Sequence, residues 1–290
     1  MQYGVYVPNF GPYGDARTLA ELAYEAEEAG WDGFFLWDQV SRSTLTPGFD
    51  AMVDPWIALT AIALRTRTIL LGNLVTPLPR RRPWMVARET VSLDHLSGGR
   101  LIFGVGAGGG SFDFEALGET SDSKTLAALL DEGLEVLTGL WSGKPYQHEG
   151  RAYSIKEAQF LPRPLQTPRI PIWVAAVWPA KAPLRRAARF DGVIPIGRDL
   201  PITAMLSPQQ MQEIVRYVAS QPEYTPPFEI VHMGITAGTD AAQDREVVAA
   251  YRQVGVTWWA EKILPERWGS WANWPLEAMR ARIRQGPPGD

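Results

Sequence analysis

The chain has 290 residues, a net charge of −4 and no cysteine, and 46% of its residues are hydrophobic. This length suits one (β/α)8 barrel of about 250 residues with insertions and a sizeable core. The lack of cysteine excludes disulfides, thiol catalysis and cysteine metal sites, and the mild acidity argues against nucleic-acid binding. Since no signal sequence or long apolar run is visible, we expect a soluble cytoplasmic protein without membrane contact.

The first part of the chain alternates expected strands and helices. Strands are predicted at 3–7 and 34–37. Asp15 caps a helix that reaches Gly30, and Asp54 followed by Pro55 begins a helix that ends near Arg65. A strand–helix–strand unit then follows, with its elements at 69–75, 83–96 and 100–105.

The second part continues the alternation after a long interval. Residues 107–169 are predicted to hold an amphipathic helix at 123–140 and a hairpin around Glu149 and Gly150. The next helices are expected at 179–189, from Ser207 with a capping box to Gln210, and at 241–254 and 275–284. The strands between them are expected at 170–176, 193–196, 230–235 and 256–260.

Eight strands that are each followed by a helix predict a closed α/β barrel. We interpret residues 1–290 as one TIM-barrel domain with an insertion at about 107–169, after the fourth strand. An insertion there would lie on the face where substrates bind, as a lid or as a decoration.

Residues with special backbone demands follow the third and fourth strands. Thr76 and Pro77 follow the third strand, and Gly106 and the glycines at 108–110 follow the fourth. Glycine lets a backbone approach a ligand closely, so these strand ends suggest a bound planar cofactor. Tight turns are the alternative explanation.

The stretch 69–110 resembles the bacterial luciferase-like family of flavin- and deazaflavin-dependent oxidoreductases. The resemblance rests on LLGNLVTPLPRRRP, ARETVSLDHLSGGR and LIFGVGAGG. Further matches extend it, in order, over about two thirds of the chain: DGFFLWD, GLEVLTGLWSGKPYQHEGRAYSI, RPLQTPRIPIWVAA and DGVIPIG. The family implies a reduced flavin bound at the carboxyl face of the barrel, a small organic substrate and a homodimer.

The resemblance implies a cofactor site at three strand ends. In the family a cis non-proline peptide bond in the third strand supports the flavin ring, and the matching bond here joins Asn73 to Leu74. The residues that match the family's cofactor-contacting positions are Asn73, Leu74, Thr76, Ala107, Gly108, Gly109, Ala175 and Ala176.

The cofactor phosphate is held in the family by a helix N-terminus after the fifth strand. Many relatives have two glycines there, whereas this chain has Val177 and Trp178. Lys181 in the next turn could supply charge instead. We therefore keep Val177 and Trp178 as candidate cofactor-binding residues.

Relatives that oxidise an alcohol or a sugar phosphate carry Asp-His after the second strand and Glu after the fourth. This chain has Asp38, Gln39 and Gly109 at those positions. Glutamine cannot accept a proton near neutral pH, and glycine has no side chain to donate one. Asp38 is thus the best-placed ionisable group, either catalytic or structural, and Gln39 is a weak catalytic candidate.

The remaining aromatic and basic candidates have two interpretations each. Trp37 and Arg80 are candidate substrate-pocket residues, although many of the twelve tryptophans could simply fill the barrel core. The cluster at 80–82 could bind an anionic group, but we favour a solvated charge run. The tryptophans at 268, 271 and 274 suit a pocket wall or, as we favour, a packed C-terminal cap.

The three histidines do not indicate a metal site. His95, His148 and His232 lack the spacing of zinc ligands, so no metal is expected. His95 lies near a helix C-terminus, where a structural role is favoured. His232 lies in the seventh strand and faces either the barrel interior or the helices.

The sequence therefore predicts an FMN-dependent monooxygenase that receives reduced flavin from a separate reductase. An apolar, tryptophan-rich site without an obvious acid–base pair favours this activity. Two alternatives remain open: hydride transfer with the deazaflavin coenzyme F420, and a barrel that binds flavin without turnover.

Overall fold

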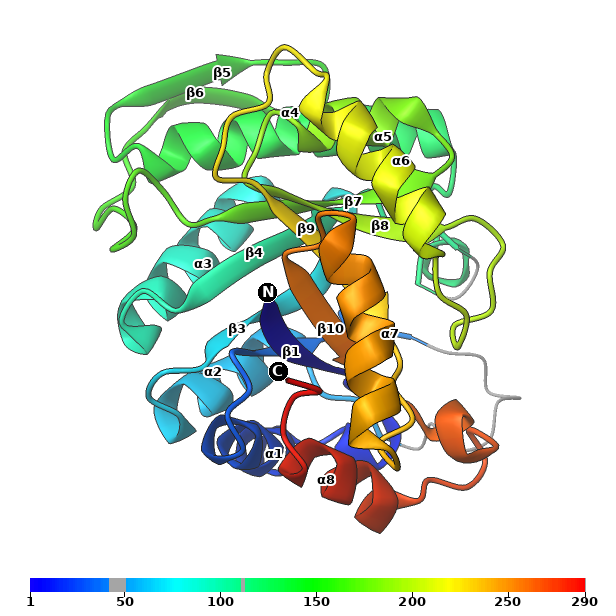
Figure 1. Cartoon of the computed structure of the whole chain (residues 1–290). Helices are drawn as coiled ribbons and strands as arrows, with labels where there is room; N and C mark the ends of the chain where they lie inside the picture. Colours follow the sequence, from blue (N-terminus) through cyan, green and yellow to red (C-terminus); the bar gives the residue numbers. More distant parts are fainter. Residues whose placement is uncertain (42–50, 111–112, 290) are drawn as a thin grey trace.

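The computed structural model describes residues 1–41, 51–110 and 113–289. Eight parallel strands close into a barrel, in the order β1-β10-β9-β8-β7-β4-β3-β2, and helices cover its outside (Figure 1). The predicted α/β barrel is confirmed. Its strands are β1 (Gln2–Val7), β2 (Gly33–Leu36), β3 (Leu70–Pro77), β4 (Leu101–Gly106), β7 (Ile172–Trp178), β8 (Gly192–Gly197), β9 (Glu229–Gly234) and β10 (Trp258–Lys262).

The helices begin where the sequence places capping residues. Asp15 accepts a hydrogen bond from the backbone of Thr18, Asp54 caps the helix that begins at Pro55, and Ser207 forms the predicted capping box. The helices are α1 (Ala16–Glu28), α2 (Pro55–Arg65), α3 (Pro83–Ser97), α4 (Ser123–Trp141), α5 (Lys181–Ala187), α6 (Pro208–Ala219), α7 (Ala241–Gln253) and α8 (Leu276–Arg284). Among the described residues, none of these helices is both long and apolar enough to cross a bilayer.

The interval between β4 and β7 contains one of the barrel helices. Helix α4 packs beside α3 in the outer layer and is therefore the fourth barrel helix. The additional material is the predicted hairpin, formed by β5 (Tyr146–Glu149) and β6 (Ser154–Ala158). Glu132 of α4 accepts hydrogen bonds from the backbone of Ala152 and Tyr153, at 3.0 and 2.7 Å. The hairpin thus lies against α4 (Figure 1) and extends the helical layer.

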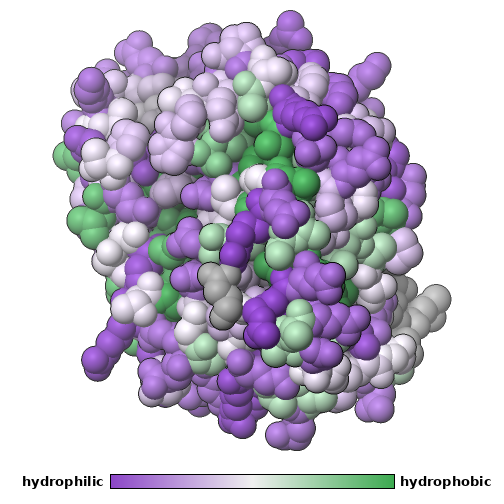
Figure 2. Space-filling view, viewed as in Figure 1, coloured by the Kyte–Doolittle hydropathy of each residue, from purple (hydrophilic) through white to green (hydrophobic). Residues whose placement is uncertain are grey.

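Side chains that alternate along the strands form two cores. The inward-facing set fills the barrel, where Trp173 contacts Phe35 and Trp258 at centroid distances of 5.7 and 5.2 Å. The outward-facing set packs beneath the helices. The visible face in Figure 2 is mainly hydrophilic, with hydrophobic residues in small recesses. Several tryptophans therefore fill the barrel core, as the sequence allowed.

Candidate functional site

Strand β3 has a bulge near the carboxyl end of the barrel. Successive side chains normally alternate between the faces of a strand, but Leu74 and Val75 both pack in the barrel interior. The ladder to β4 shifts register between Asn73 and Thr76, and the peptide bond between Leu74 and Val75 is cis. The predicted position of the cis bond, between Asn73 and Leu74, is wrong by one residue. The pair that turns inward is Leu74 and Val75, whereas Asn73 stays outside the interior cluster.

Two of the predicted cofactor-binding side chains contact each other. Asn73 Nδ2 donates to Thr76 Oγ1 at 3.2 Å, and both residues are buried. Asn73 Oδ1 has no hydrogen-bond partner among the described residues. The side chains of Asn73 and Thr76 therefore pair with each other, and Leu74 and Val75 are the bulge residues that face the barrel interior.

Glycines in β4 make room for this bulge. A Cβ on Gly104 would lie 2.0 Å from the carbonyl oxygen of Asn73, and a Cβ on Gly106 would lie 2.7 Å from Val75 Cγ2. Such distances are far shorter than van der Waals contact, so a side chain at either position would displace the bulge. The glycine at 106, which the sequence analysis linked to a cofactor, is required by packing within the protein.

Among the glycines that follow β4, Gly108 is also confined by neighbouring protein atoms. Gly108 and Gly109 have φ values of 71° and 118°, which favour glycine. A Cβ on Gly108 would lie 2.5 Å from the Phe114 ring and 2.7 Å from Pro77 Cβ. Ala107 packs against the outer core. The close approach at Gly108 is therefore to protein side chains, which agrees with the tight-turn alternative.

Aromatic residues form a wall beside the bulge. The Tyr6 hydroxyl donates to the carbonyl oxygen of Leu74 at 2.8 Å, which is the carbonyl of the cis peptide. Burial raises the pKa of Tyr6, so its phenol stays protonated. Trp37 stacks on Tyr6 at 5.9 Å, and Phe10 and Trp271 pack edge-on against Trp37 at 5.5 and 6.0 Å. Trp37 therefore packs in this aromatic wall, and its role as a substrate-pocket residue stays a prediction.

The tryptophans after β10 divide between two environments. Trp271 and Trp274 contact Phe10 at 5.5 and 6.0 Å and form a cap over the ends of β1 and β2. Trp268 is 37% exposed and lies beside Arg267. The predicted C-terminal cap therefore consists of Trp271 and Trp274, which are also part of the aromatic wall.

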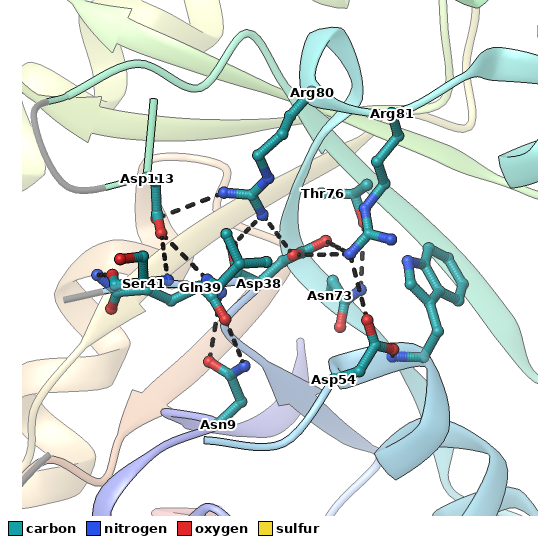
Figure 3. Close-up of polar contacts among 12 residues, drawn as sticks. Asn9, Asp38, Gln39, Ser41, Asp54, Asn73, Thr76, Arg80, Arg81 and Asp113 are labelled. Atoms are coloured by element: carbon teal, nitrogen blue, oxygen red, sulfur yellow. Dashed lines mark hydrogen bonds and ion pairs between the residues drawn. The ribbon is translucent and has the colours of Figure 1, made fainter. Parts of the chain in front are cut away.

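Asp38 is held in a buried ion-pair cluster (Figure 3). Its carboxylate accepts hydrogen bonds from Arg80 Nη2 at 2.7 Å and Arg81 Nη2 at 3.0 Å. Burial raises the pKa of Asp38, and the two guanidinium groups oppose this rise. The interpretation of 80–82 as a solvated run is wrong for Arg80 and Arg81, whose side chains are 7% and 17% exposed. Since buried charges need partners, Asp38 pairs with both arginines, and Asp113 near Arg80 and Asp54 near Arg81 supply further negative charge.

Asp113 connects this cluster to the segment that follows β2 (Figure 3). Asp113 accepts hydrogen bonds from the backbone N–H groups of Val40 and Ser41, both at 3.0 Å. Arg80 Nη1 lies 3.5 Å from the Asp113 carboxylate. The side chain of Arg80 is therefore used to join the segments after β2, β3 and β4.

Gln39 is fixed mainly through its backbone. Asn9 Nδ2 donates to the Gln39 carbonyl at 2.9 Å, and Asn9 Oδ1 accepts from the Gln39 N–H at 3.3 Å. The Gln39 side chain donates to the Ser41 carbonyl at 3.2 Å. An amide in this arrangement can position the loop but cannot act as a base.

The end of β7 presents alternate residues to the barrel mouth. Ala175 Cβ lies 3.3 Å from the position of a Cβ on Gly106, so it points inward. Ala176 and Trp178 belong to the outer core. Lys181 Nζ lies 4.2 Å from the Trp178 ring centroid, within the helical layer. The structure therefore does not bring Trp178 or Lys181 to the mouth, because Trp178 lies an odd number of residues beyond Ala175.

The histidines are separate from one another. His95 Nε2 lies 2.7 Å from the Arg163 carbonyl oxygen, and His148 Nε2 lies 3.3 Å from Glu132. His232 faces the helices, where its ring stacks on Tyr251 at 4.1 Å. In the part of the chain that the structure describes, no group of three metal-ligating side chains comes together.

The chain matches one known protein family over most of its length. Residues 1–282 match the family described as luciferase-like monooxygenase. The chain belongs to this family. The match covers all eight barrel strands, and the resemblance noted in the sequence is confirmed.

Curated relatives include enzymes that use either of two cofactors. The luciferase-like chain is 34% identical over 197 residues to the F420-dependent glucose-6-phosphate dehydrogenase of Beutenbergia cavernae, covering 67% of this chain and 55% of that protein. It is 28% identical over 159 residues to the oxygenase component of the flavin-dependent trigonelline monooxygenase of Acinetobacter baylyi, covering 54% and 42%. The matched region thus spans about half the length of these relatives.

A solved structure supports the luciferase-like fold. The monooxygenase RslO1 from Streptomyces bottropensis superposes with a TM-score of 0.76 at 21% identity, covering 98% of this chain and 97% of that one. The likeness concerns the barrel architecture.

Three residues near the mouth were missed by the sequence analysis. Tyr6 and Val75 shape the bulge, and Lys262 ends β10 inside the barrel. A lysine at the carboxyl end of a barrel strand is itself a signal of function. Tyr6 lies two residues after Gly4 in the first strand, so the two residues share a face, and this spacing could have placed Tyr6 at the carboxyl end of the strand.

Proposed function

We propose that this luciferase-like protein binds reduced FMN at the barrel mouth and acts as a monooxygenase on a small organic substrate. The names of its relatives support an oxidoreductase, since one is flavin-dependent and another is F420-dependent. When bound, the flavin supplies the reducing electrons and the reaction with oxygen. The chain's own residues bind and orient the ring and the substrate and exclude water.

The chemistry of the mouth fits a flat, largely apolar ring. Val75 and Ala175 supply apolar surface from neighbouring parts of the barrel, and Trp37 and Tyr6 supply the aromatic wall. The Trp37 Nε1 donor is buried without a partner among the described residues. A buried donor of this kind is satisfied by an acceptor such as a ring carbonyl.

The ion pairs of Asp38 are the observation that favours oxygenation over hydride transfer. Oxidation of an alcohol by hydride transfer requires a base for the hydroxyl proton. Asp38 is committed to Arg80 and Arg81, Gln39 is an amide, and Gly109 has no side chain. An oxygenase that relies on orientation and water exclusion needs no base at these positions, so this observation favours FMN over F420.

A titration of the purified apoprotein with FMN, anaerobically reduced FMN and F420 tests the proposal. We expect preferential binding of the FMN forms and substrate-dependent oxygen consumption. Preference for F420 would replace the proposal with hydride transfer. Tight flavin binding without substrate-dependent oxidation across a broad panel would favour a non-catalytic flavin-binding barrel. Failure of all three cofactors to bind would overturn the assignment.

A pair of variants tests where the ring binds. Ala175→Leu adds bulk at the mouth and should weaken FMN binding by about tenfold or more, roughly 1.4 kcal/mol. Ala128→Leu adds the same bulk on the exposed side of α4 and should leave binding unchanged. Thermal unfolding of both variants checks that they fold. Equal affinities would remove Ala175 from the site.

The same proposal includes the molecular partners. The term oxygenase component in a relative's name supports a separate reductase that delivers reduced flavin. A second copy of the chain is the proposed structural partner, because apolar side chains are exposed on α2 and α3. The cytoplasmic location expected from the sequence is part of this proposal.

A further inference from the structure

A cavity of about 250 Å³ lies between β8 and β9, with Tyr6 of β1 in its wall. The two strands pair only near their beginnings, and their register ends at Val193 and Ile230. Beyond that point β8 stays paired with β7, and β9 stays paired with β10. Pro195, which has no N–H to donate, lies on the diverging part of β8. The strand sequence therefore favours the separation of β8 from β9 beyond Val193 and Ile230.

The walls of this cavity are mainly apolar. Ile196, Leu206 and Met233 line it, together with part of the segment 200–204. Tyr6 also lines it, and the hydroxyl of Tyr6 holds the Leu74 carbonyl in the bulge. The cavity and the proposed flavin site consequently share a wall.

Lys262 brings a cation into these apolar surroundings. The residue is 5% exposed, and its Nζ donates to the carbonyl oxygens of Ile202 at 2.6 Å and Ala204 at 2.8 Å. An ammonium group has three N–H donors, so these two contacts leave one donor for a ligand. Carbonyl dipoles do not neutralise the charge, and a buried cation is stabilised most by an anionic oxygen.

The carboxylate of Glu261, the residue next to Lys262 in the chain, is not the anionic partner of the Lys262 ammonium. Glu261 accepts hydrogen bonds from Arg267 Nη1 and Trp259 Nε1, both at 2.7 Å. Successive residues of β10 point to opposite sides of the sheet, so Glu261 faces away from the cavity. Burial lowers the pKa of Lys262 to about 8, which leaves the ammonium mostly protonated at neutral pH.

His232, whose ring packs on Tyr251 on the helix side, still reaches the cavity because β8 and β9 separate there. It lines the cavity, and its Nε2 atom is buried without a partner among the described residues. Burial and the ammonium of Lys262 lower the pKa of His232 to about 3, so the ring is uncharged at neutral pH. A neutral imidazole can exchange a hydrogen bond with a ligand oxygen without competing for the cation.

We infer that this cavity is the substrate pocket, and that its ligand is a small molecule with an apolar body and one carboxylate or equivalent oxyanion, held by Lys262. The description of the ligand as a substrate rests on the proposed function. The apolar walls accept the body of the molecule, and Lys262 pairs with its charge. The bound molecule would then contact Tyr6, the residue whose hydroxyl holds the Leu74 carbonyl of the bulge.

Calorimetric titration with acids and their neutral amides tests this inference. The probes are benzoate with benzamide and hexanoate with hexanamide, because each pair differs mainly in charge. We expect the wild type to bind at least one acid about tenfold more tightly than its amide. Lys262→Met should abolish this preference, whereas Lys262→Arg should retain part of it. Lys156→Met, which removes an exposed lysine of the hairpin, should leave the preference unchanged.

The outcomes separate ligand binding from a structural role. If Lys262 only fixed the segment 200–204, Lys262→Met would weaken acid and amide equally, and this result would overturn the inference. Absence of any acid preference in the wild type would overturn it as well.

Titration of the same proteins with FMN separates the inference from the proposed function. Flavin binding without acid preference would reject the pocket and keep the function. Acid preference without flavin binding would reject the function and keep an acid-binding cavity.

Discussion

Asp38 compensates two buried cations, and this role predicts the effect of removing its charge. In Asp38→Asn, the guanidinium groups of Arg80 and Arg81 would stay buried and keep only their longer ion pairs, to Asp113 at 3.5 Å and to Asp54 at 3.8 Å. Breaking a buried pair in this way costs about 3 kcal/mol. We expect urea denaturation to show a loss of this size in the free energy of unfolding.

A surface pair provides the control for this measurement. Glu21 bridges Arg65 at 2.9 Å, but both side chains are largely exposed, and such pairs contribute little. Glu21→Gln should leave the unfolding midpoint unchanged. A stable Asp38→Asn protein that had lost turnover would instead make Asp38 a catalytic base.

Which residues meet at the site could be predicted only in part. The sequence selected Asp38 and Arg80 for separate roles, and their pairing depends on the barrel bringing the ends of β2 and β3 together. The cis bond was misplaced because its position depends on which two side chains face the interior. The role of Gly106 was also misread, since the packing partner Val75 lies on a neighbouring strand.

At the scale of elements, Glu25 joins the first helix of the barrel to the last. Its carboxylate on α1 accepts hydrogen bonds from Arg280 at 2.8 Å and Arg284 at 2.9 Å, both on α8. Hydrogen bonds from Arg280 are the main cause that lowers the pKa of Glu25 to about 2, from an ordinary value of 4.5. The ionised form is therefore favoured in the folded state, and its stabilisation is present above pH 4.5 and lost as the pH falls toward 2.

This linkage predicts a pH-dependent difference between wild type and Glu25→Gln. At pH 7 the variant should lose about 1 kcal/mol of unfolding free energy, after allowance for solvent screening of the half-exposed arginines. The difference should shrink between pH 4.5 and 2 in urea denaturation. Glu28→Gln, an exposed change on the same helix, should show no such trend. A difference that is constant with pH would indicate lost packing rather than lost charge.

Elements with local signals were predictable from the sequence. Asp15, Asp54 and Ser207 cap the helices that they were predicted to start, since capping depends on residues within one turn. The hairpin around Glu149 and Gly150 was found from its turn residues. The role of 107–169 was less accessible, because assigning α4 to the barrel requires its packing against α3, a non-local contact.

At the scale of the whole molecule, helices α2 and α3 expose large hydrophobic side chains. Leu64 and Ile57 on α2 are 69% and 62% exposed, the highest values among the exposed large hydrophobic side chains of the described residues. Met85 and Leu96 on α3 are 53% and 45% exposed. The residues at 57 and 64 are seven apart and therefore lie on one face of α2. Exposed apolar side chains on two adjacent helices are typical of an association site.

The second copy that we propose as partner would use this surface, because the twofold axis of a dimer lets the same apolar helices meet each other. Ile57→Glu combined with Leu64→Glu would place two carboxylates in that interface, where desolvation without partners opposes association. Sedimentation of the wild type at micromolar concentration should give twice the monomer mass of 32.2 kDa, and the double variant should sediment as a monomer. Leu276→Glu, at an exposed position on α8, should leave the dimer intact. A monomeric wild type would contradict the proposed dimer. A double variant that still dimerises would show that the exposed face of α2 is not the interface.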